Sequence, residues 1–146
     1  MDDYVGQKLI AAHRASKDGL PGYDVTYGGY LSWSPEEAFE EAYQDVRQGM
    51  NFGGAIFMLK RGKKVARKGW NGKDMWIALM DGMSLPPFNS QEPGKKVNDR
   101  TAAFIGEDTP LVTLPYIATW TADGKWLPGW LASQTDMLAD DWVVVD

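Results

Sequence analysis

Closely spaced turn sequences divide this chain into short extended runs, and they constrain its fold more than any other feature. Gly28-Gly29 separates two runs rich in aromatic and β-branched residues, 23–27 and 30–33. Asn71-Gly72, the best hairpin sequence in the chain, lies between two further runs. These dipeptides readily adopt the positive φ angles of two-residue hairpin turns. The sequence therefore predicts an α+β fold of short antiparallel strands wrapped around one or two short helices, and not a βαβ series.

Further strands are expected where apolar and polar residues alternate. They are 5–13, 63–70, 74–80, 111–121 with an irregularity at Pro115, 125–132 after a turn at 122–124, and 142–145. Between residues 81 and 108 the chain is rich in Gly, Pro, Asn and Ser and shows no period. The sequence predicts a long loop there, and loops of that length are more often functional or mobile than inert.

Residues 1–48 are predicted to form an accessory acidic module, called the N-terminal module below. The formal net charge of the chain is −5, and this module carries nine acidic and four basic residues, whereas the rest carries eleven of each. The module combines the first hairpin with a helix. Ser34 as N-cap and Glu37 as its capping-box partner predict that this helix runs from Pro35 to about Arg47. Residues 50–146 are predicted to form a second, nucleotide-signal-binding domain.

Two more helices are predicted from their capping residues. Asn51 is placed to cap a helix through Arg61 that stops at Gly62. Ser133, with Asp136 three residues later, predicts one or two further helical turns.

The inventory of reactive side chains excludes several classes of function. The chain has no cysteine and a single histidine, His13, so it can form neither a thiolate site nor a pair of histidine ligands. Phosphate-loop, dinucleotide-glycine, zinc-protease and hydrolase motifs are missing. We therefore expect no metal and no cofactor. The net charge disfavours nucleic-acid polymers and anionic membranes as partners.

The sequence also gives no indication of secretion or membrane insertion. Its first residues, Met-Asp-Asp-Tyr, do not resemble the basic start of a signal peptide. No apolar run approaches the roughly 20 residues that span a bilayer. We expect a cytoplasmic protein.

Six cations lie within residues 60–68, and such a cluster could hold phosphate. The alternative is a solvated strand face with cations placed favourably at a helix C-terminus. Arg67 and Trp70 differ from the lysines because they are three residues apart around the predicted hairpin. One planar cation and one aromatic face could line the same pocket there.

Six of the seven tryptophans follow residue 50. Some must form the core of so small a domain, but an excess of indoles also suits stacking against a base or a sugar. Trp76 and Trp142 are the expected core members, since strand-like apolar residues flank them.

The stretch 130–142 gathers hydrogen-bonding side chains at a predicted helix start. Ser133, Gln134, Thr135 and Asp136 offer groups that read ribose hydroxyls and phosphate oxygens in binding sites. The alternative is an ordinary N-cap followed by a polar turn. Asp140 and Asp141 are expected to be exposed charges between a helix and a strand.

Four blocks of residues carry a resemblance to a known family. They are Met50-Asn-Phe-Gly-x-Ala, Gly62-Lys-Lys-Val-Ala-Arg-Lys-Gly-Trp-Asn-Gly72, Pro115-Tyr-Ile-x-x-x-Thr121-Ala-Asp-Gly124 and Gly129-Trp-Leu-Ala-Ser-Gln-Thr-Asp-Met-Leu-Ala-Asp-Asp-Trp142. Residues 50–146 thereby resemble the second Thoeris anti-defence family, phage sponge proteins for nucleotide second messengers. Members of that family usually start where Met50 stands, so the N-terminal module is a departure that could change assembly or pocket access.

The resemblance implies a binding protein and not an enzyme. It implies a homotetramer with pockets at subunit interfaces, acting in the cytoplasm of the infected bacterial host. The implied ligands are cyclic ADP-ribose isomers made by TIR-domain proteins, and in some members cyclic oligonucleotides. Sequestration would keep the signal from its effector.

Roles within such a site follow from ligand chemistry. Adenine needs a flat apolar partner, for which Trp70 is the first choice and Trp130 the second. Arg67 and the backbone of residues 133–135 would meet the pyrophosphate. Asn71, Gln134 and Asp136 would accept or donate hydrogen bonds at ribose hydroxyls.

Two other functions stay open at the level of sequence. One is a nucleotide hydrolase that uses Asp136, Asp140 or Asp141 as acid or base. The other is a structural or protein-binding phage module with no small-molecule ligand, in which the acidic N-terminal module docks a partner.

Overall fold

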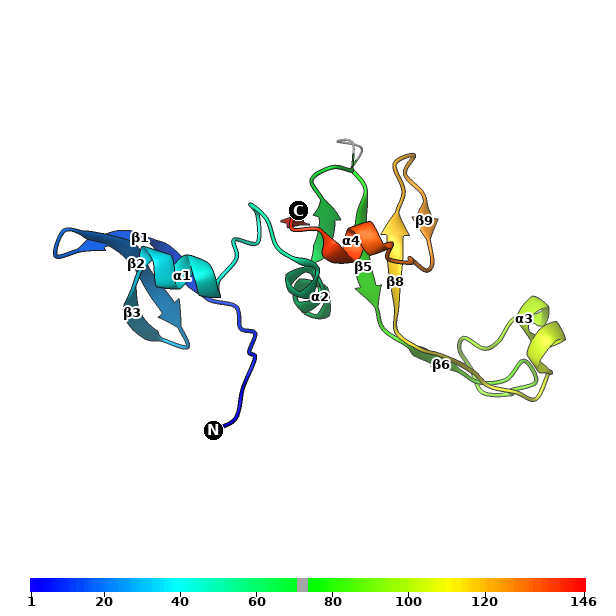
Figure 1. Cartoon of the computed structure of the whole chain (residues 1–146). Helices are drawn as coiled ribbons and strands as arrows, with labels where there is room; N and C mark the ends of the chain where they lie inside the picture. Colours follow the sequence, from blue (N-terminus) through cyan, green and yellow to red (C-terminus); the bar gives the residue numbers. More distant parts are fainter. Residues whose placement is uncertain (71–73) are drawn as a thin grey trace.

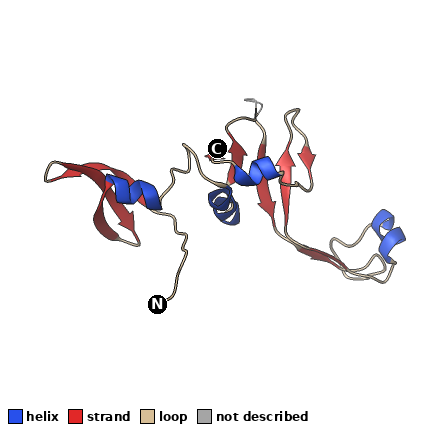
Figure 2. Cartoon of the chain, in the orientation of Figure 1, coloured by secondary structure: helices blue, strands red, loops and turns tan. Residues whose placement is uncertain are grey.

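The structure, a computed structural model, describes residues 1–70 and 74–146, and the predicted turn at Asn71-Gly72 lies outside these residues (Figure 1). Along the chain the described elements are β1 (Ala11–Lys17), β2 (Leu20–Tyr27), β3 (Tyr30–Pro35), α1 (Glu36–Ala42), α2 (Phe52–Lys60), β4 (Lys64–Arg67), β5 (Trp76–Met80), β6 (Met83–Leu85), α3 (Asp99–Ile105), β7 (Leu111–Thr113), β8 (Tyr116–Trp120), β9 (Trp126–Leu127), α4 (Gln134–Leu138) and β10 (Trp142–Val145). The paired strands are antiparallel and form three small sheets, which confirms the predicted α+β class (Figure 2).

The N-terminal module is a three-stranded sheet, β1-β2-β3, with α1 packed against it. The predicted Gly-Gly hairpin is confirmed, because Gly28 and Gly29 adopt φ angles of 56° and 84° between β2 and β3. The Tyr23 and Phe39 rings stack at 4.1 Å and join the sheet to α1. Arg14 on β1 pairs with Glu36 on α1, which adds a polar link at the surface.

Two predictions for this module are wrong in position or length. The strand expected at 5–13 begins at Ala11. The helix begins at Glu36 and ends at Ala42, well short of Arg47, and Ser34 does not cap it. Ser34 instead pairs with Tyr23 in the sheet, which leaves Pro35 at the N-cap position with no side-chain cap.

The early end of α1 has a tertiary cause. The chain beyond it runs alongside β10, where the Val144 N–H donates to the Val46 carbonyl at 2.7 Å. Met50 and Trp142 exchange two backbone hydrogen bonds further along. Tyr43 is extended and the chain then turns at 46–48, where the Gly49 N–H donates to the Asp45 carbonyl, so the apolar periodicity of the sequence does not continue as one helix.

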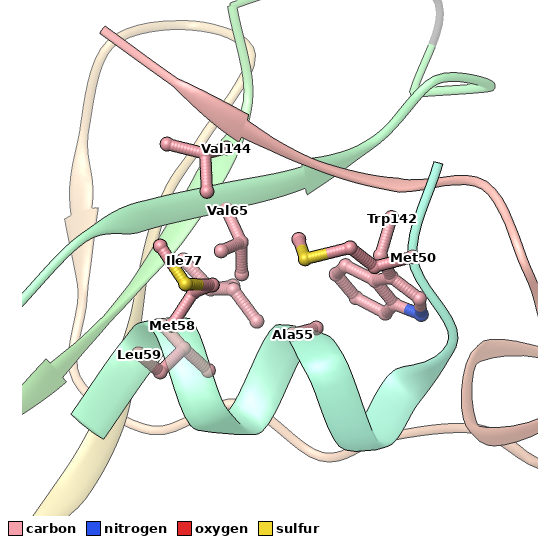
Figure 3. Packing of buried hydrophobic residues seen from close by; sticks show 8 residues of the cluster. All are labelled: Met50, Ala55, Met58, Leu59, Val65, Ile77, Trp142 and Val144. Carbon is pink, nitrogen blue, oxygen red and sulfur yellow. The ribbon is translucent and has the colours of Figure 1, made fainter. Parts of the chain in front are cut away.

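A five-stranded sheet, in the order β10-β4-β5-β8-β9, carries the main core. Helix α2 lies across one face of this sheet and packs Ala55, Met58 and Leu59 against the strands (Figure 3). Val65 and Ile77 meet the helix from the sheet and are fully buried. The predicted caps of α2 are confirmed: the Gly54 N–H donates to the Asn51 side chain at 2.8 Å, and the helix stops before Gly62.

The segment 81–108 is not the structureless loop that the sequence predicts. It contains β6 and α3, and with β7 it forms an arm that leaves the five-stranded sheet and has α3 near its far end (Figure 1). Val97 and Ala102 are buried in a small core of its own. Asn98 caps α3 by accepting from the Thr101 N–H at 2.8 Å. β6 and α3 are too short to show a periodic pattern of apolar residues in the sequence.

The last part of the chain follows the prediction closely. Pro115 interrupts the run between β7 and β8, and a turn with Gly124 at φ 77° leads into β9, although that strand has only two residues. Helix α4 and strand β10 stand where the sequence placed them. Among the described residues no helix is long and apolar enough to cross a membrane.

Candidate functional site

Four aromatic rings gather where α2, β10 and the loops before α4 and after β4 meet. The indole of Trp142 is fully buried, with the ring centroids of Trp70 and Trp130 at 5.5 and 5.9 Å and nearly perpendicular to it. Trp70 and Trp130 also contact each other at 6.4 Å, and Phe52 of α2 closes the group. Trp70 and Trp130 are both half-buried, so the cluster offers aromatic surface to solvent on a rigid base.

Arg67 ties this cluster to the polar turn of α4. It lies at the end of β4, directly across from Trp142 in the β10–β4 register. Its Nε donates to Asp141 Oδ1 at 2.9 Å, and its Nη1 donates to Asp136 Oδ1 at 3.1 Å. The Arg67 and Asp136 side chains are only 20% and 16% exposed. Such a planar fork between two carboxylates fixes geometry as well as charge.

The ionisation of this group follows from its contacts. Hydrogen bonds to Asp141 and Asp136 raise the pKa of Arg67. The hydrogen bond from Arg67 lowers the pKa of Asp141. Burial alone would raise the pKa of Asp136, but hydrogen bonds from Ser133 and Arg67 outweigh it and hold that pKa below its ordinary value. One guanidinium and two carboxylates therefore stand together as ions at neutral pH.

Ser133 and Asp136 form the predicted capping box at the start of α4. The Asp136 N–H donates to Ser133 Oγ and the Ser133 N–H donates to Asp136 Oδ2, each at 3.0 Å. The Trp142 indole N–H donates to the Asp136 carbonyl at 2.9 Å and anchors the turn to the core. Gln134 and Thr135 follow in the first turn with exposed side chains.

The structure brings most of the predicted ligand residues together. Those that share this region are Arg67, Trp70, Trp130, Ser133, Gln134, Thr135 and Asp136, whereas Asn71 lies outside the described residues. Their roles toward a ligand stay predictions. The structure adds that three of the five Arg67 N–H donors and both capping-box side chains are already engaged within the chain.

Two neighbours of the site, Asp141 and Phe52, were misjudged or missed from the sequence. Asp141 was expected to be an exposed charge but is half-buried and paired with Arg67, while Asp140 is exposed as expected. Trp142 is confirmed as core, yet it also forms the base of the cluster, with Phe52 beside it. Trp76, the other expected core member, is only half-buried. The antiparallel pairing of β10 with β4 brings Asp141 to Arg67, and no local pattern in the sequence indicates this pairing.

Among the remaining cations of residues 60–68, Lys68 borders the site, because its backbone N–H donates to the Asp141 carbonyl at 3.0 Å, and the others lie at the end of α2 and the start of β4. Lys60 occupies the last turn of α2, and Arg61 packs over the Phe57 ring at 4.8 Å. Lys63 and Lys68 are exposed, and Lys64 donates to the Asp146 carbonyl at 2.5 Å. This arrangement is the solvated alternative weighed from the sequence.

Trp70 and Trp130 present their half-buried rings on the surface of the protein. Two grooves elsewhere among the described residues contain no member of the cluster. The larger groove lies between segment 5–12, α1 with the residues that follow it, and α2. A flat ring can be held against Trp70 and Trp130, with the exposed amide of Gln134 and hydroxyl of Thr135 at the edge of the cluster.

Comparison with known proteins finds matches to the part of the chain that carries this candidate site. A family model described as the Thoeris anti-defense 2-like domain matches residues 50–145. A curated phage protein, Thoeris anti-defense 2 of Bacillus phage SP01, is 36% identical over 96 residues, which is 66% of this chain and 94% of that protein. The match includes the aromatic cluster, Arg67 and the α4 turn, and it begins where the N-terminal module ends.

Proposed function

The chain belongs to the Thoeris anti-defense 2-like family, and we propose that it is a phage anti-defence protein that binds and sequesters cyclic nucleotide immune messengers without cleaving them. The ligands proposed are cyclic ADP-ribose isomers made by TIR-domain proteins, with cyclic oligonucleotides as a second class. Its place of action is the cytoplasm of the infected host, and neither a membrane nor a nucleic-acid polymer is a partner.

The observation that carries this proposal is the pair of half-buried indoles, Trp70 and Trp130, held on buried Trp142. Base–aromatic stacking contributes about 1–3 kcal/mol per base. The near-perpendicular contacts with Trp142 support both rings from behind, so less side-chain freedom is lost when a base arrives. Preformed aromatic surface is what capture of an adenine requires.

The polar partners of a nucleotide are supplied beside this surface. Gln134 and Thr135 offer an amide and a hydroxyl for ribose oxygens, and the Arg67 guanidinium is the nearest positive group to the turn. Two carboxylates already balance that cation, so the pyrophosphate needs donors beyond Arg67. We propose that a second copy of the chain completes this side of the pocket, as the homotetramer implied by the family would allow.

Binding without turnover fits the chemistry of the cluster. Asp136 and Asp141, the carboxylates nearest the indoles, have lowered pKa values and are held by Arg67. An ionised carboxylate has no proton to donate, and a lowered pKa with both oxygens engaged makes it a weak general base. We therefore propose that the protein is not an enzyme.

A calorimetry panel tests the proposal. Purified full-length protein is titrated with cyclic ADP-ribose isomers, cyclic dinucleotides and cyclic trinucleotides, with linear ADP-ribose as the matched control. We expect saturable binding of at least one cyclic ligand, and recovery of the same molecule intact after heat denaturation. Recovery of linear ADP-ribose, or turnover beyond one ligand per site, would show an enzyme instead.

A further inference from the structure

The larger groove joins the N-terminal module to helix α2 and contains no residue of the aromatic cluster. It is lined by segment 5–12, by residues 39–46 and by the N-terminal part of α2 with the residues before it, and its volume is about 1130 Å³. Every residue of segment 5–12 lines it, which corresponds to about 26 Å of extended chain. A groove of that length suits an outstretched chain better than a compact small molecule.

Residues 5–9, called the lead segment below, run outstretched into β1 and belong to no sheet (Figure 1). Ala11 pairs with Thr26 near the end of β2, so the lead segment extends past the sheet. Within the described residues its main chain takes part in no backbone–backbone hydrogen bond. A row of unpaired N–H and C=O groups is the template on which another strand pairs.

Two side-chain contacts hold the lead segment in place. The Gln7 amide donates to the Gly53 carbonyl of α2 at 3.2 Å. The Lys8 amine lies 4.6 Å from the centroid of the Tyr27 ring. Both contacts use side chains of the segment, so it is positioned beside the groove while its own N–H and C=O groups stay available.

Aromatic rings line the groove alongside the lead segment. Tyr23, Phe39 and Tyr43 form a continuous row, with centroid distances of 4.1 and 5.0 Å. Phe57 adds a ring from α2. Successive side chains of a strand point to opposite sides, so an added strand turns every second side chain toward such a wall. Apolar residues at those positions bury their surface against the rings.

The charge of the groove is negative. Glu40, Glu41 and Asp45 line it, and Lys8 is the single cation among its lining residues. Glu40 already pairs with Arg14, whereas Glu41 and Asp45 form no ion pair with any residue that the structure describes. Charge complementarity therefore favours basic side chains at the remaining positions of an added strand.

We propose that the groove binds an extended peptide segment of a partner protein, in which apolar and basic side chains alternate, and that this segment pairs with residues 5–9 as an added strand. Main-chain hydrogen bonds then give affinity, and the rings and carboxylates select the sequence. Most of this site lies before residue 50, where the family match begins. Docking is thus a second activity of this chain, and it does not rest on the proposed function.

A synthetic peptide of alternating valine and lysine, about eight residues long and blocked at both ends, tests the proposal. It is titrated by calorimetry into the full chain. One control is a peptide of alternating valine and glutamate, which has the wrong charge. The other is the valine–lysine peptide with its backbone amides methylated, which keeps the side chains but cannot donate to a strand. We expect saturable binding of the unmethylated valine–lysine peptide alone.

Hydrogen exchange identifies the mode of binding. An added strand bonds only to the N–H groups along one edge, so every second amide of residues 5–9 becomes protected. We expect these amides to exchange at least about tenfold more slowly at saturating peptide. The intervening amides should keep their rates.

Proline substitutions test the same main-chain groups. Lys8→Pro and Leu9→Pro each remove one N–H, and neighbouring N–H groups of a strand point to opposite edges. One of the two variants should therefore weaken binding of the valine–lysine peptide at least about tenfold. Lys8→Ala and Leu9→Ala lose the same side chains but keep the N–H, and they are the matched controls. Both positions are exposed, and circular dichroism establishes that each variant keeps the fold.

A charge reversal tests the selection of basic side chains. Glu41→Lys should weaken the valine–lysine peptide about tenfold and strengthen the valine–glutamate peptide. Glu37→Lys is the matched control, because Glu37 is exposed on α1 but does not line the groove.

The outcomes separate this inference from its alternatives. No saturable binding of the valine–lysine peptide, equal binding of the methylated peptide, or unchanged exchange of residues 5–9 would each overturn it. Protection of residues 5–9 that grows with protein concentration in the absence of peptide would place a second copy in the groove, and would overturn it too. Calorimetry with the cyclic nucleotides is run on the same variants. Peptide docking without nucleotide binding would refute the proposed function alone, and the reverse result would refute only the docking site.

Discussion

Arg67 on β4 and Asp136 on α4, 69 residues apart in the chain, meet at 3.1 Å and join the sheet to the polar turn of the site. The same guanidinium holds Asp141 at the start of β10. This clamp, the Arg67 side chain with Asp136 and Asp141, adds to the β10–β4 pairing and to the hydrogen bond of the Trp142 indole, which also join these segments.

Arg67→Ala should destabilise the protein by about 2 kcal/mol. The substitution removes the charge-assisted hydrogen bonds to two half-buried carboxylates. It also leaves these carboxylates close together without their cation, so that they repel each other. Chemical denaturation at neutral pH measures the change in the free energy of unfolding. Arg100→Ala, at an exposed position of α3, is the control and should stay within about 0.5 kcal/mol of wild type. Equal stability of the two variants would show that the clamp contributes nothing.

The clamp also predicts a loss of stability in acid. Asp136 and Asp141 have pKa values below the ordinary 3.8 in the folded protein, so the unfolded chain binds their protons more strongly. Their contribution is therefore fully present above that value and is lost as pH falls through the folded values. We expect the free energy of unfolding to decline as the pH falls below about 4.

Asp141→Asn tests the source of that decline. The amide does not titrate, so only one of the two carboxylates with a lowered pKa remains. The free energy of unfolding should therefore depend less steeply on pH in this range. Denaturant titrations at a series of pH values compare the slopes. A slope unchanged from wild type would assign the acid sensitivity to other carboxylates, such as Asp146, whose pKa is lowered by Arg47.

The parts of the fold that could be predicted from the sequence are those set by contacts between residues close together in the chain. Asn51, the Gly28-Gly29 turn and the capping box of Ser133 with Asp136 act within a few residues, and all were predictable. The end of α1 was not, because Val46 is recruited by β10 nearly a hundred residues later.

In the candidate site, too, the features set by local sequence could be predicted and those set by distant contacts could not. Trp70, Trp130 and the α4 turn were found from residue type and spacing, and the family resemblance pointed to the same blocks. The pairing of Asp141 with Arg67 comes from the β10–β4 register, which no local pattern reveals. Asp141 therefore looked like a solvated charge, and Arg67 looked more available to a phosphate than its contacts make it.

Trp70→Ala should abolish capture of the cyclic nucleotide while leaving the oligomer intact. Trp70 is half-buried and rests edge-on against Trp142, so its loss removes a stacking surface with limited damage to the core. Affinity should fall at least about tenfold by calorimetry, the effect of one lost base stack. Tyr30→Ala, which removes an aromatic ring 82% exposed on β3, should bind like wild type. Loss of assembly together with binding would assign Trp70 to the core instead.

Gly22→Ala should disrupt the N-terminal module and spare nucleotide binding. Gly22 is buried in β2, and a Cβ there would collide with the Ser34 carbonyl and with the Trp33 indole that packs over it. The sheet must shift, at a cost of about 2 kcal/mol, the usual result of overpacking. Hydrogen exchange should therefore accelerate across β1 to β3. The proposed ligand residues all follow Met50, so the affinity for the cyclic nucleotide should stay within about threefold of wild type. Gly6→Ala, where the added methyl meets open space, is the matched control. A parallel loss of affinity in Gly22→Ala alone would mean that the N-terminal module shapes the pocket.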